Sequence, residues 1–359
     1  RQGAQDFDDD GWIDMAEYDR WSVRPRLFWT GNNGARLYAT LGLMSEDRVG
    51  GTLPGQTVPD GNGFVHSQDT ERFDGGLTAQ GPVGGSMRWN VRGSAMLQDQ
   101  DKRFGRARQD DRQESYLIEA SIAGDRPRST WVAGLALQSE RFDSKDFPAF
   151  DYRYDVPGLF AEVQRELGSE VSASLSARFE DHSEYGRQFS PRLSLLYRPG
   201  DWTVRASYGQ GYFAPTPFVE DIEAAGLSRL SPLQGLQEET ATTASLDVGY
   251  RFADLESNVT LFGSNVDGVT RLEPFALEAG DPLNRVRLIN SPGESRIRGS
   301  EVLLRYYWRD FKLTASYLYL DATERDPLGG ERRRIALTPK HSAGFVAMWE
   351  QHGRGRLGF

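Results

Sequence analysis

Apolar and polar side chains alternate along most of this chain with a period of two residues. The segment 202–209 reads WTVRASYG, so Trp, Val, Ala and Tyr occupy one parity while Thr, Arg, Ser and Gly occupy the other. The segments 171–179 and 311–319 show the same alternation. A period of two is typical of a β-strand with one apolar and one polar face. The pattern therefore predicts an all-β protein.

Applied to the whole chain, this pattern predicts about sixteen strands, many of them longer than the usual five or six residues. The expected strands lie near 24–30, 35–46, 71–80, 86–98, 113–124, 129–142, 157–167, 170–182, 187–199, 202–213, 239–252, 255–268, 294–309, 311–322, 340–350 and 353–359.

The connections between these strands alternate between short and long. The short ones lie at 31–34, 81–85, 124–128, 167–170, 198–201, 252–255 and 309–310. Between them lie connections near 46–71, 99–113, 143–156, 183–187, 213–239, 268–294 and 322–340, all long and polar except 183–187. This rhythm is typical of outer-membrane barrels, which have tight periplasmic turns at one rim and long external loops at the other. We therefore expect a transmembrane antiparallel up-and-down β-barrel.

A soluble β-sandwich would also give each strand one apolar face. Three features favour the barrel. Strands of ten to fourteen residues suit a tilted bilayer crossing of about nine to eleven residues, aromatic residues collect at strand ends, and sixteen strands are too many for one sandwich. A propeller would show a blade repeat of about 40 to 50 residues, and the sequence has none. No run of apolar residues is long enough for a transmembrane helix.

Composition narrows the function. The net charge of −10 argues against a nucleic-acid binder. The chain has no cysteine, which excludes disulfides, thiolate metal sites and a cysteine nucleophile. Its four histidines lie far apart in sequence, and no arrangement of nucleophile, base and orienting acid is visible. We expect no enzymatic activity.

Four motifs carry a resemblance to a known family. The run 178–216, RFEDHSEYGRQFSPRLSLLYRPGDWTVRASYGQGYFAPT, is followed in order by LQEETATTASLDVGYRF (236–252), RIRGSEVLLRY (296–306) and LTPKHSAGFVAMW (337–349). Their sequence and spacing resemble the barrel domain of TonB-dependent outer-membrane receptors. The resemblance is specific over about half of the chain, whereas the first 130 residues resemble the family only in their general pattern.

The resemblance implies a bacterial outer-membrane barrel of 22 strands closed by an N-terminal plug. Residues 1–359 would form about sixteen of these strands, with the plug, the TonB box and the outermost strands missing. The implied function is energised uptake of a scarce, bulky nutrient such as a ferric siderophore, vitamin B12 or haem. Its partners would be outer-membrane lipid, the TonB complex through the missing N-terminal region, and an iron chelate or similar ligand, with the receptor a monomer.

A calcium-like motif, DFDDDGWIDMAE, opens the chain within a segment, 1–23, that we expect to be an external loop. It matches the twelve-residue EF-hand loop pattern, with a glycine at the sixth position. Ca²⁺ prefers six to eight oxygen ligands. The candidate ligands are Asp6, Asp8, Asp10, the carbonyl of Trp12, Asp14 and Glu17. The alternative is a solvated acidic loop, and a true helix–loop–helix is not expected because a strand pattern follows.

A second candidate site is RFDSKDFPAFDYRYD (141–155), in an expected external loop. Aromatic and cationic side chains can hold a large, anionic, partly apolar ligand such as a ferric chelate. The candidate residues are Phe147, Phe150, Tyr152, Arg153 and Tyr154. The alternative is that these aromatics rest on lipopolysaccharide or on other loops.

Two further functions remain open at this stage. A passive porin would have an open lumen and no plug. A soluble, calcium-binding, β-rich surface protein would be extracted without detergent.

Overall fold

A computed structural model describes residues 1–59, 61–218, 226–274, 285–326, 330–351, 353 and 355–358. Most of them form one antiparallel sheet. Its strands are β1 (Glu17–Val23), β2 (Arg26–Thr30), β3 (Arg36–Gly51), β4 (Val65–Gly84), β5 (Met87–Phe104), β6 (Ala107–Arg126), β7 (Ser129–Ser144), β8 (Tyr152–Glu166), β9 (Val171–His182), β10 (Gly186–Tyr197), β11 (Trp202–Phe213), β12 (Glu239–Phe252), β13 (Leu255–Asp267), β16 (Ser295–Trp308), β17 (Phe311–Arg325), β18 (Arg332–Arg334), β19 (His341–Gln351) and β20 (Gly355–Gly358). A separate hairpin joins β14 (Thr270–Pro274) to β15 (Val286–Asn290), and two short 3₁₀ helices are η1 (Pro148–Phe150) and η2 (Leu227–Arg229).

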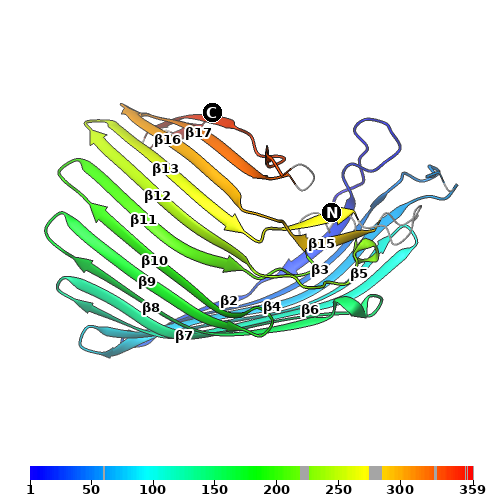
Figure 1. Cartoon of the computed structure of the whole chain (residues 1–359), viewed down its shortest axis with the longest axis horizontal. Coiled ribbons are helices and arrows are strands. Elements are labelled where there is room, and N and C mark those ends of the chain that lie inside the picture. Colours follow the sequence, from blue (N-terminus) through cyan, green and yellow to red (C-terminus); the bar gives the residue numbers. More distant parts are fainter. Residues whose placement is uncertain are drawn as a thin grey trace.

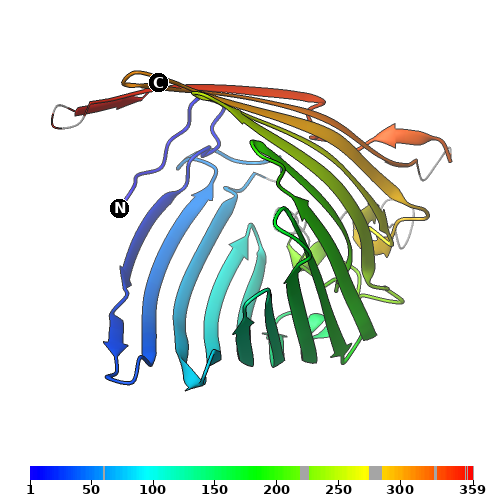
Figure 2. The ribbon, with the colours of Figure 1, turned by 90° about the vertical axis from the view of Figure 1, so that its left-hand side faces the viewer.

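The sheet is an up-and-down meander in which each strand pairs with the next along the chain, the β14–β15 hairpin being bypassed. β1 and β2 pair with the two halves of β3, and β18 and β19 pair with the two halves of β17. Its 18 strands therefore occupy sixteen positions across the sheet, which confirms the predicted architecture. Among the described residues no pairing joins β20 to β1 or β2, and the sheet curves into an open trough (Figures 1 and 2).

The two rims of the trough differ as the connections predict. Short turns such as 127–128, 253–254 and 309–310 lie at one rim, at the left of Figure 1. The N-terminal segment, the β14–β15 hairpin and the longer connections lie at the other. We call these the turn rim and the loop rim. Over the described ranges, no helix combines the length and apolarity that a membrane crossing requires.

Two adjacent rows of side chains across β7–β10 show how polarity and burial are distributed. Cross-strand pairing aligns Leu135, Leu159, Phe179 and Phe189, which are 61%, 54%, 41% and 60% exposed. The next row extends onto β6 and aligns Glu119, Ala136, Gly158, Glu180 and Gln188. Apart from the glycine, each of these residues is at most 9% exposed.

Side chains converge on the concave side of a curved sheet and diverge on the convex side. The polar row therefore faces the hollow of the trough, and the apolar row faces outward. We call these the inward and the outward face.

Two tryptophans near the turn rim cover glycines on the neighbouring strand. The indole of Trp89 lies over Gly81, and that of Trp131 lies over Gly124, so that a Cβ on either glycine would approach the ring to 2.8 and 2.6 Å. An aromatic ring over a cross-strand glycine restores packing that glycine lacks. These tryptophans also fit the aromatic girdle expected where an outward face leaves the bilayer.

Several predicted boundaries are wrong at the loop rim. The segment 99–113 is not a long loop, because β5 continues to Phe104 and β6 starts at Ala107. β8 begins at Tyr152 rather than at 157. The expected loop 1–23 contains β1, and β14, β15 and β18 lie within expected loops. Residues 60, 219–225, 275–284 and 327–329 of four expected loops, and 352, 354 and 359 near the last strand, lie outside the described residues.

The reason is physical. Where neither face of a strand is apolar, the alternation on which the prediction rests is lost. Between 98 and 113, for example, nearly every residue is polar, yet the backbone pairs without interruption.

A small apolar core lies at the loop rim, between connections far apart in sequence. It contains Phe142, Phe150, Leu227, Leu230 and Leu288, all at most 6% exposed. A parallel bridge from Leu230 to Val286 ties η2 to β15. This core fixes the loops relative to the mouth of the trough.

Candidate functional site

An aromatic cluster forms where β7, β8 and β9 reach the loop rim. The rings of Tyr152 and Tyr154 stack with centroids 4.6 Å apart, and Tyr154 also lies 4.9 Å from His182 and 6.0 Å from Tyr185. Tyr152 donates a hydrogen bond from its hydroxyl to Oε1 of Glu140 at 2.5 Å. Burial raises the pKa of Tyr185, whose hydroxyl donates to the carbonyl of Pro215.

The structure thus brings together Tyr152 and Tyr154, two of the predicted ligand-contacting residues. Beside them lie three residues that the motif did not single out, namely Glu140, His182 and Tyr185. His182 and Glu140 lie on the same face as Tyr152 and Tyr154, because β7, β8 and β9 pair in register there. Strand parity alone would have revealed this, had the start of β8 been placed correctly.

The remaining predicted residues lie elsewhere. Phe150 is 5% exposed inside the apolar core, and Phe147 packs against that core. Arg153 alternates with the tyrosines, so it faces outward, where its Nε lies 3.0 Å from Oδ2 of Asp155. Arg141 is the cross-strand partner of Arg153, so it also faces outward, and Lys145 pairs with Asp110. The cations of this motif are therefore not available to a ligand on the aromatic cluster.

A cavity of about 430 Å³ adjoins the cluster. Its lining includes Tyr154, His182, Glu140, Glu180 and Tyr212. The two carboxylates make the cavity acidic, although Glu180 is paired with Arg178 at 2.7 Å. This environment suits hydroxyl, amide or cationic groups better than a multiply charged anion.

The opening acidic motif forms a tight loop held to the loop rim. Gly11, with φ of +90°, accepts a hydrogen bond at its carbonyl from Leu53, and Ile13 donates to the carbonyl of Gly51. The positive φ explains the need for glycine at this position.

Three carboxylates of the motif converge. Ligand oxygens of Asp6, Asp8 and Asp14 lie within 4.8 Å of one another. Asp6 receives a hydrogen bond from the amide of Gly11 at its Oδ2, while its Oδ1 is buried and has no hydrogen-bond partner among the described residues. The pKa of Asp8 is raised: the amide of Asp10 hydrogen-bonds to it and lowers the pKa, but the charge of Asp10, desolvation and the charges of Asp14 and Asp6 together raise it more.

The other predicted ligands are not in this group of converging oxygens. Oδ1 of Asp10 accepts a hydrogen bond from the amide of Trp12. Trp12 bridges to Thr52, and Glu17 is the first residue of β1. The chain therefore does not fold here as an EF-hand, and the geometry offers a three-carboxylate group instead.

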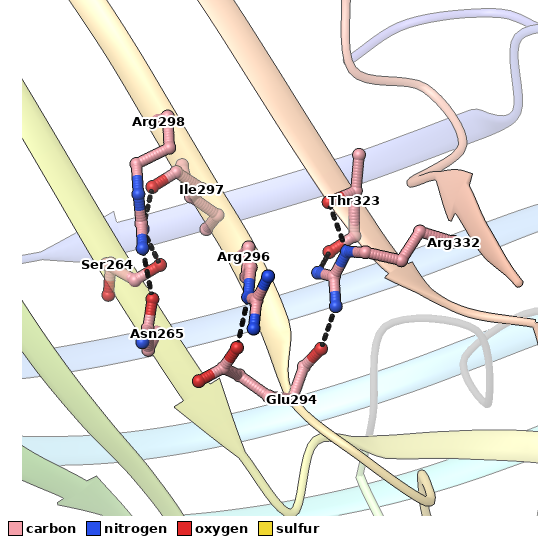
Figure 3. Close-up of polar contacts among 8 residues, drawn as sticks. All are labelled: Ser264, Asn265, Glu294, Arg296, Ile297, Arg298, Thr323 and Arg332. Carbon is pink, nitrogen blue, oxygen red and sulfur yellow. Dashed lines mark hydrogen bonds and ion pairs between the residues drawn. The ribbon is translucent and has the colours of Figure 1, made fainter.

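Arginines dominate the loop rim of β16 and β17 (Figure 3). Arg298 donates to the carbonyl of Ser264 at 2.8 Å and to the side chain of Asn265, while Arg296 pairs with Glu294. Arg332, the first residue of β18, donates to Thr323 and to the Glu294 carbonyl (Figure 3). The bond from Arg296 and the charges of the nearby arginines lower the pKa of Glu294. The contacts of Arg332 with Thr323 hold β18 against β17, and Arg296, Arg298 and Arg332 all have structural partners.

Comparison with solved structures shows the same fold. The chain is 14% identical to a mutant of the ferric enterobactin receptor PfeA of Pseudomonas aeruginosa, with a TM-score of 0.76, covering 99% of this chain and 58% of that one. It is 13% identical to the Serratia marcescens hemophore receptor HasR, with a TM-score of 0.72, covering 95% and 63%. It is 15% identical to the siderophore receptor PirA of Acinetobacter baumannii, with a TM-score of 0.69, covering 94% of this chain and 57% of that one. The chain thus spans about 57 to 63% of these receptors.

A search of curated proteins finds no match. A family model does match, under the description TonB dependent receptor-like, beta-barrel, over residues 2–359. Receptors of this type are bacterial outer-membrane transporters rather than enzymes, which confirms the predicted location and the predicted lack of catalysis. The chain belongs to the TonB-dependent receptor family, and the matched region is its β-barrel.

Proposed function

We propose that the protein takes up a bulky nutrient across the bacterial outer membrane, using energy delivered by the TonB complex. The observation that carries this is the family match over residues 2–359. A polar, buried inward face beside an apolar, exposed outward face supports it, because this is the distribution that a membrane barrel requires. The TonB complex would act through a region of the receptor N-terminal to this barrel.

A ferric siderophore is the first candidate substrate, with haem and vitamin B12 as alternatives. Two similar structures are named as siderophore or ferric enterobactin receptors, and the hemophore receptor was solved with heme. In this chain the tyrosine cluster faces Glu140 and Glu180, while Arg153 faces away. The chelate that this cluster would accept is therefore neutral or cationic.

Iron uptake tests the proposal. Cells that produce the receptor should accumulate a radioactive ferric chelate, and deletion of TonB or collapse of the proton gradient should abolish this uptake. Uptake that persists without TonB would support the passive porin instead, and open-channel conductance in planar bilayers would strengthen that reading. A receptor monomer in detergent is also expected.

We also propose that the acidic loop binds Ca²⁺ weakly on the external side of the membrane. The converging oxygens of Asp6, Asp8 and Asp14 and the unpartnered Oδ1 of Asp6 support this. A cation there would relieve the repulsion that raises the pKa of Asp8. Its role would be to order the loop, since external calcium is high enough to fill a site with a Kd of about 10⁻⁴ to 10⁻³ M.

Calorimetric titration of Ca²⁺ into the purified protein tests this. Asp6→Asn should weaken binding at least about tenfold, because it removes one charge from the group. Asp9→Asn is the matched control: Asp9 lies outside the group and has a φ of +57°, which asparagine tolerates. No heat of binding at millimolar Ca²⁺, or equal loss in both variants, would contradict the proposal.

A further inference from the structure

A buried histidine, His182, stands where β9 ends at the loop rim. It is 4% exposed, and its ring lies between two tyrosines, with the centroids 4.9 Å from Tyr154 and 5.0 Å from Tyr185. An unperturbed histidine changes its charge between pH 5 and 8. A histidine packed into the rim in this way therefore makes the surrounding structure sensitive to pH.

The imidazole of His182 closes the turn that joins β9 to β10. Its Nδ1 accepts hydrogen bonds from the amides of Glu184 and Tyr185, at 3.1 and 3.2 Å. A ring nitrogen accepts a hydrogen bond only while it carries no proton. Both bonds therefore require the neutral ring with its proton on Nε2, and protonation of Nδ1 removes both of them at once.

The same turn holds a second segment of the rim, the connection 214–217 that follows β11. The hydroxyl of Tyr185 donates to the carbonyl of Pro215 at 2.7 Å, and Pro215 is less than 2% exposed. The amide of Tyr185 is in turn held by His182. One imidazole thus positions a tyrosine, and that tyrosine positions the buried connection.

Four carboxylates and three phenols face the ring from the elements packed around it. The carboxylates are those of Glu140 on β7, Glu180 on β9, Glu184 in the turn and Glu238 before β12, and the phenols are those of Tyr154, Tyr185 and Tyr212. Burial lowers the pKa of His182, the four carboxylates raise it, and the net shift is downward. Three of these carboxylates also have other partners, which are Tyr152, Arg178 and Gln188.

The direction of the pH dependence follows from this shift. In the closed turn the pKa of His182 lies below its ordinary value of 6.5, so the ring is neutral at pH 7. In an open turn the ring reaches water and its pKa returns to about 6.5. The open form therefore binds more protons, and opening becomes more favourable as the pH falls from about 6.5 towards the lowered pKa of the closed form.

We propose that His182 is a pH-sensitive latch, whose protonation opens the turn 183–185 and releases the connection 214–217. The loop rim of β9–β11 is then closed in neutral surroundings and loosens in acid. The latch goes beyond the proposed uptake function and does not depend on it, because it concerns the conformation of the rim whatever the receptor carries.

Hydrogen–deuterium exchange of the detergent-purified protein at pH 7.5 and 5.5 tests the latch. The matched variant is His182→Asn, because an asparagine side chain accepts a hydrogen bond from the amide two residues on and does not titrate. Division of each exchange rate by that of the variant at the same pH removes the chemical pH dependence of exchange. For residues 183–186 and 213–218 this ratio should rise about three- to tenfold from pH 7.5 to 5.5, because uptake of one proton changes the opening equilibrium by at most about tenfold over this range.

Two further variants separate the parts of the latch. His66→Asn is the control, because His66 lies on β4 against Phe104, and the rise should remain unchanged in this variant. Tyr185→Phe keeps the ring but removes the hydroxyl that reaches Pro215. In this variant the rise should persist for 183–186 and disappear for 213–218.

The latch is overturned if exchange has the same pH dependence in the unmodified protein and in His182→Asn, or if His66→Asn abolishes the rise. A rise that persists for 213–218 in Tyr185→Phe overturns the link to the second segment. If His182→Asn does not fold, nuclear magnetic resonance of a variant that keeps His182 and has asparagine at the other three histidines decides the matter. The ring should then titrate below pH 6.5 together with the signals of the turn, and titration at or above pH 6.5 overturns the latch.

Discussion

The two rows that cross β7–β10 differ by one residue along each strand, yet their environments are opposite. Leu135, Leu159, Phe179 and Phe189 are apolar and exposed, while Glu119, Glu180 and Gln188 are polar and buried. In a water-soluble protein the assignment would be reversed. Full burial of a leucine or phenylalanine contributes about 1.5–3 kcal/mol, so transfer of the four half-exposed apolar side chains into lipid contributes on the order of 3–6 kcal/mol. The outward face is stable only against hydrocarbon.

The largest expected effect comes from placing a charge on the outward face. Leu175→Arg, at the middle of β9 and 55% exposed, should destabilise the membrane-inserted protein by about 2–4 kcal/mol, because an arginine would lie near the bilayer centre. Ser174→Arg, one residue away, faces inward beside Glu162 and should cost less than about 1 kcal/mol. Urea titration in lipid vesicles measures both. Equal losses of stability in the two variants would mean that the outward and the inward face are in contact with the same solvent.

A smaller effect tests the packing at the turn rim. Gly124→Val would bring a side chain within 2.6 Å of the Trp131 indole and should cost about 1–3 kcal/mol by overpacking. Gly168→Val is the comparison: it lies in the turn after β8, where an added Cβ would meet no heavy atom of the described residues within 4 Å beyond its chain neighbours, and it should cost under about 1 kcal/mol. Tryptophan fluorescence should also shift in the first variant alone. An unshifted spectrum would show that the indole does not depend on the glycine.

The smallest expected effect tests the ion pairs of the inward face. Nη2 of Arg92 lies 2.8 Å from Oε2 of Glu119, whose side chain is 10% exposed, so Arg92→Ala should cost about 1–2 kcal/mol by leaving that carboxylate unpaired. Arg88→Ala removes an exposed pair, 3.4 Å from Asp125, and should cost under about 0.5 kcal/mol. Equal unfolding midpoints for the two variants would show that water screens the ion pair of Arg92 as strongly as it screens the exposed pair of Arg88.

These contrasts also explain how far the sequence alone predicts the structure. Sixteen strand positions and the two rims follow from alternation, because lipid on one side and polar groups on the other impose a period of two. The same rule fails beyond the bilayer, where polar side chains occupy both faces of the strands. It therefore missed β1 and the outer ends of β5 and β6.

The candidate sites were predicted less completely. The aromatic motif located Tyr152 and Tyr154, but the face of Arg153 depends on where β8 begins, and the motif alone could not give that. The core formed by Phe142, Leu227 and Leu288 joins residues far apart in sequence, so no local pattern could predict it. The placement of Gln98 beside Gln113 depends on the register of β5 and β6, which the sequence also left open.

The difference between the two faces can be measured directly on one strand. Because the chain has no cysteine, single cysteines can be introduced at each position from Val171 to Phe179 and spin-labelled in lipid bilayers. Accessibility to oxygen, which concentrates in lipid, should peak at 171, 173, 175, 177 and 179, while accessibility to a water-soluble nickel complex should peak at the positions between them. Uniform access of the nickel complex to all nine positions would contradict this prediction.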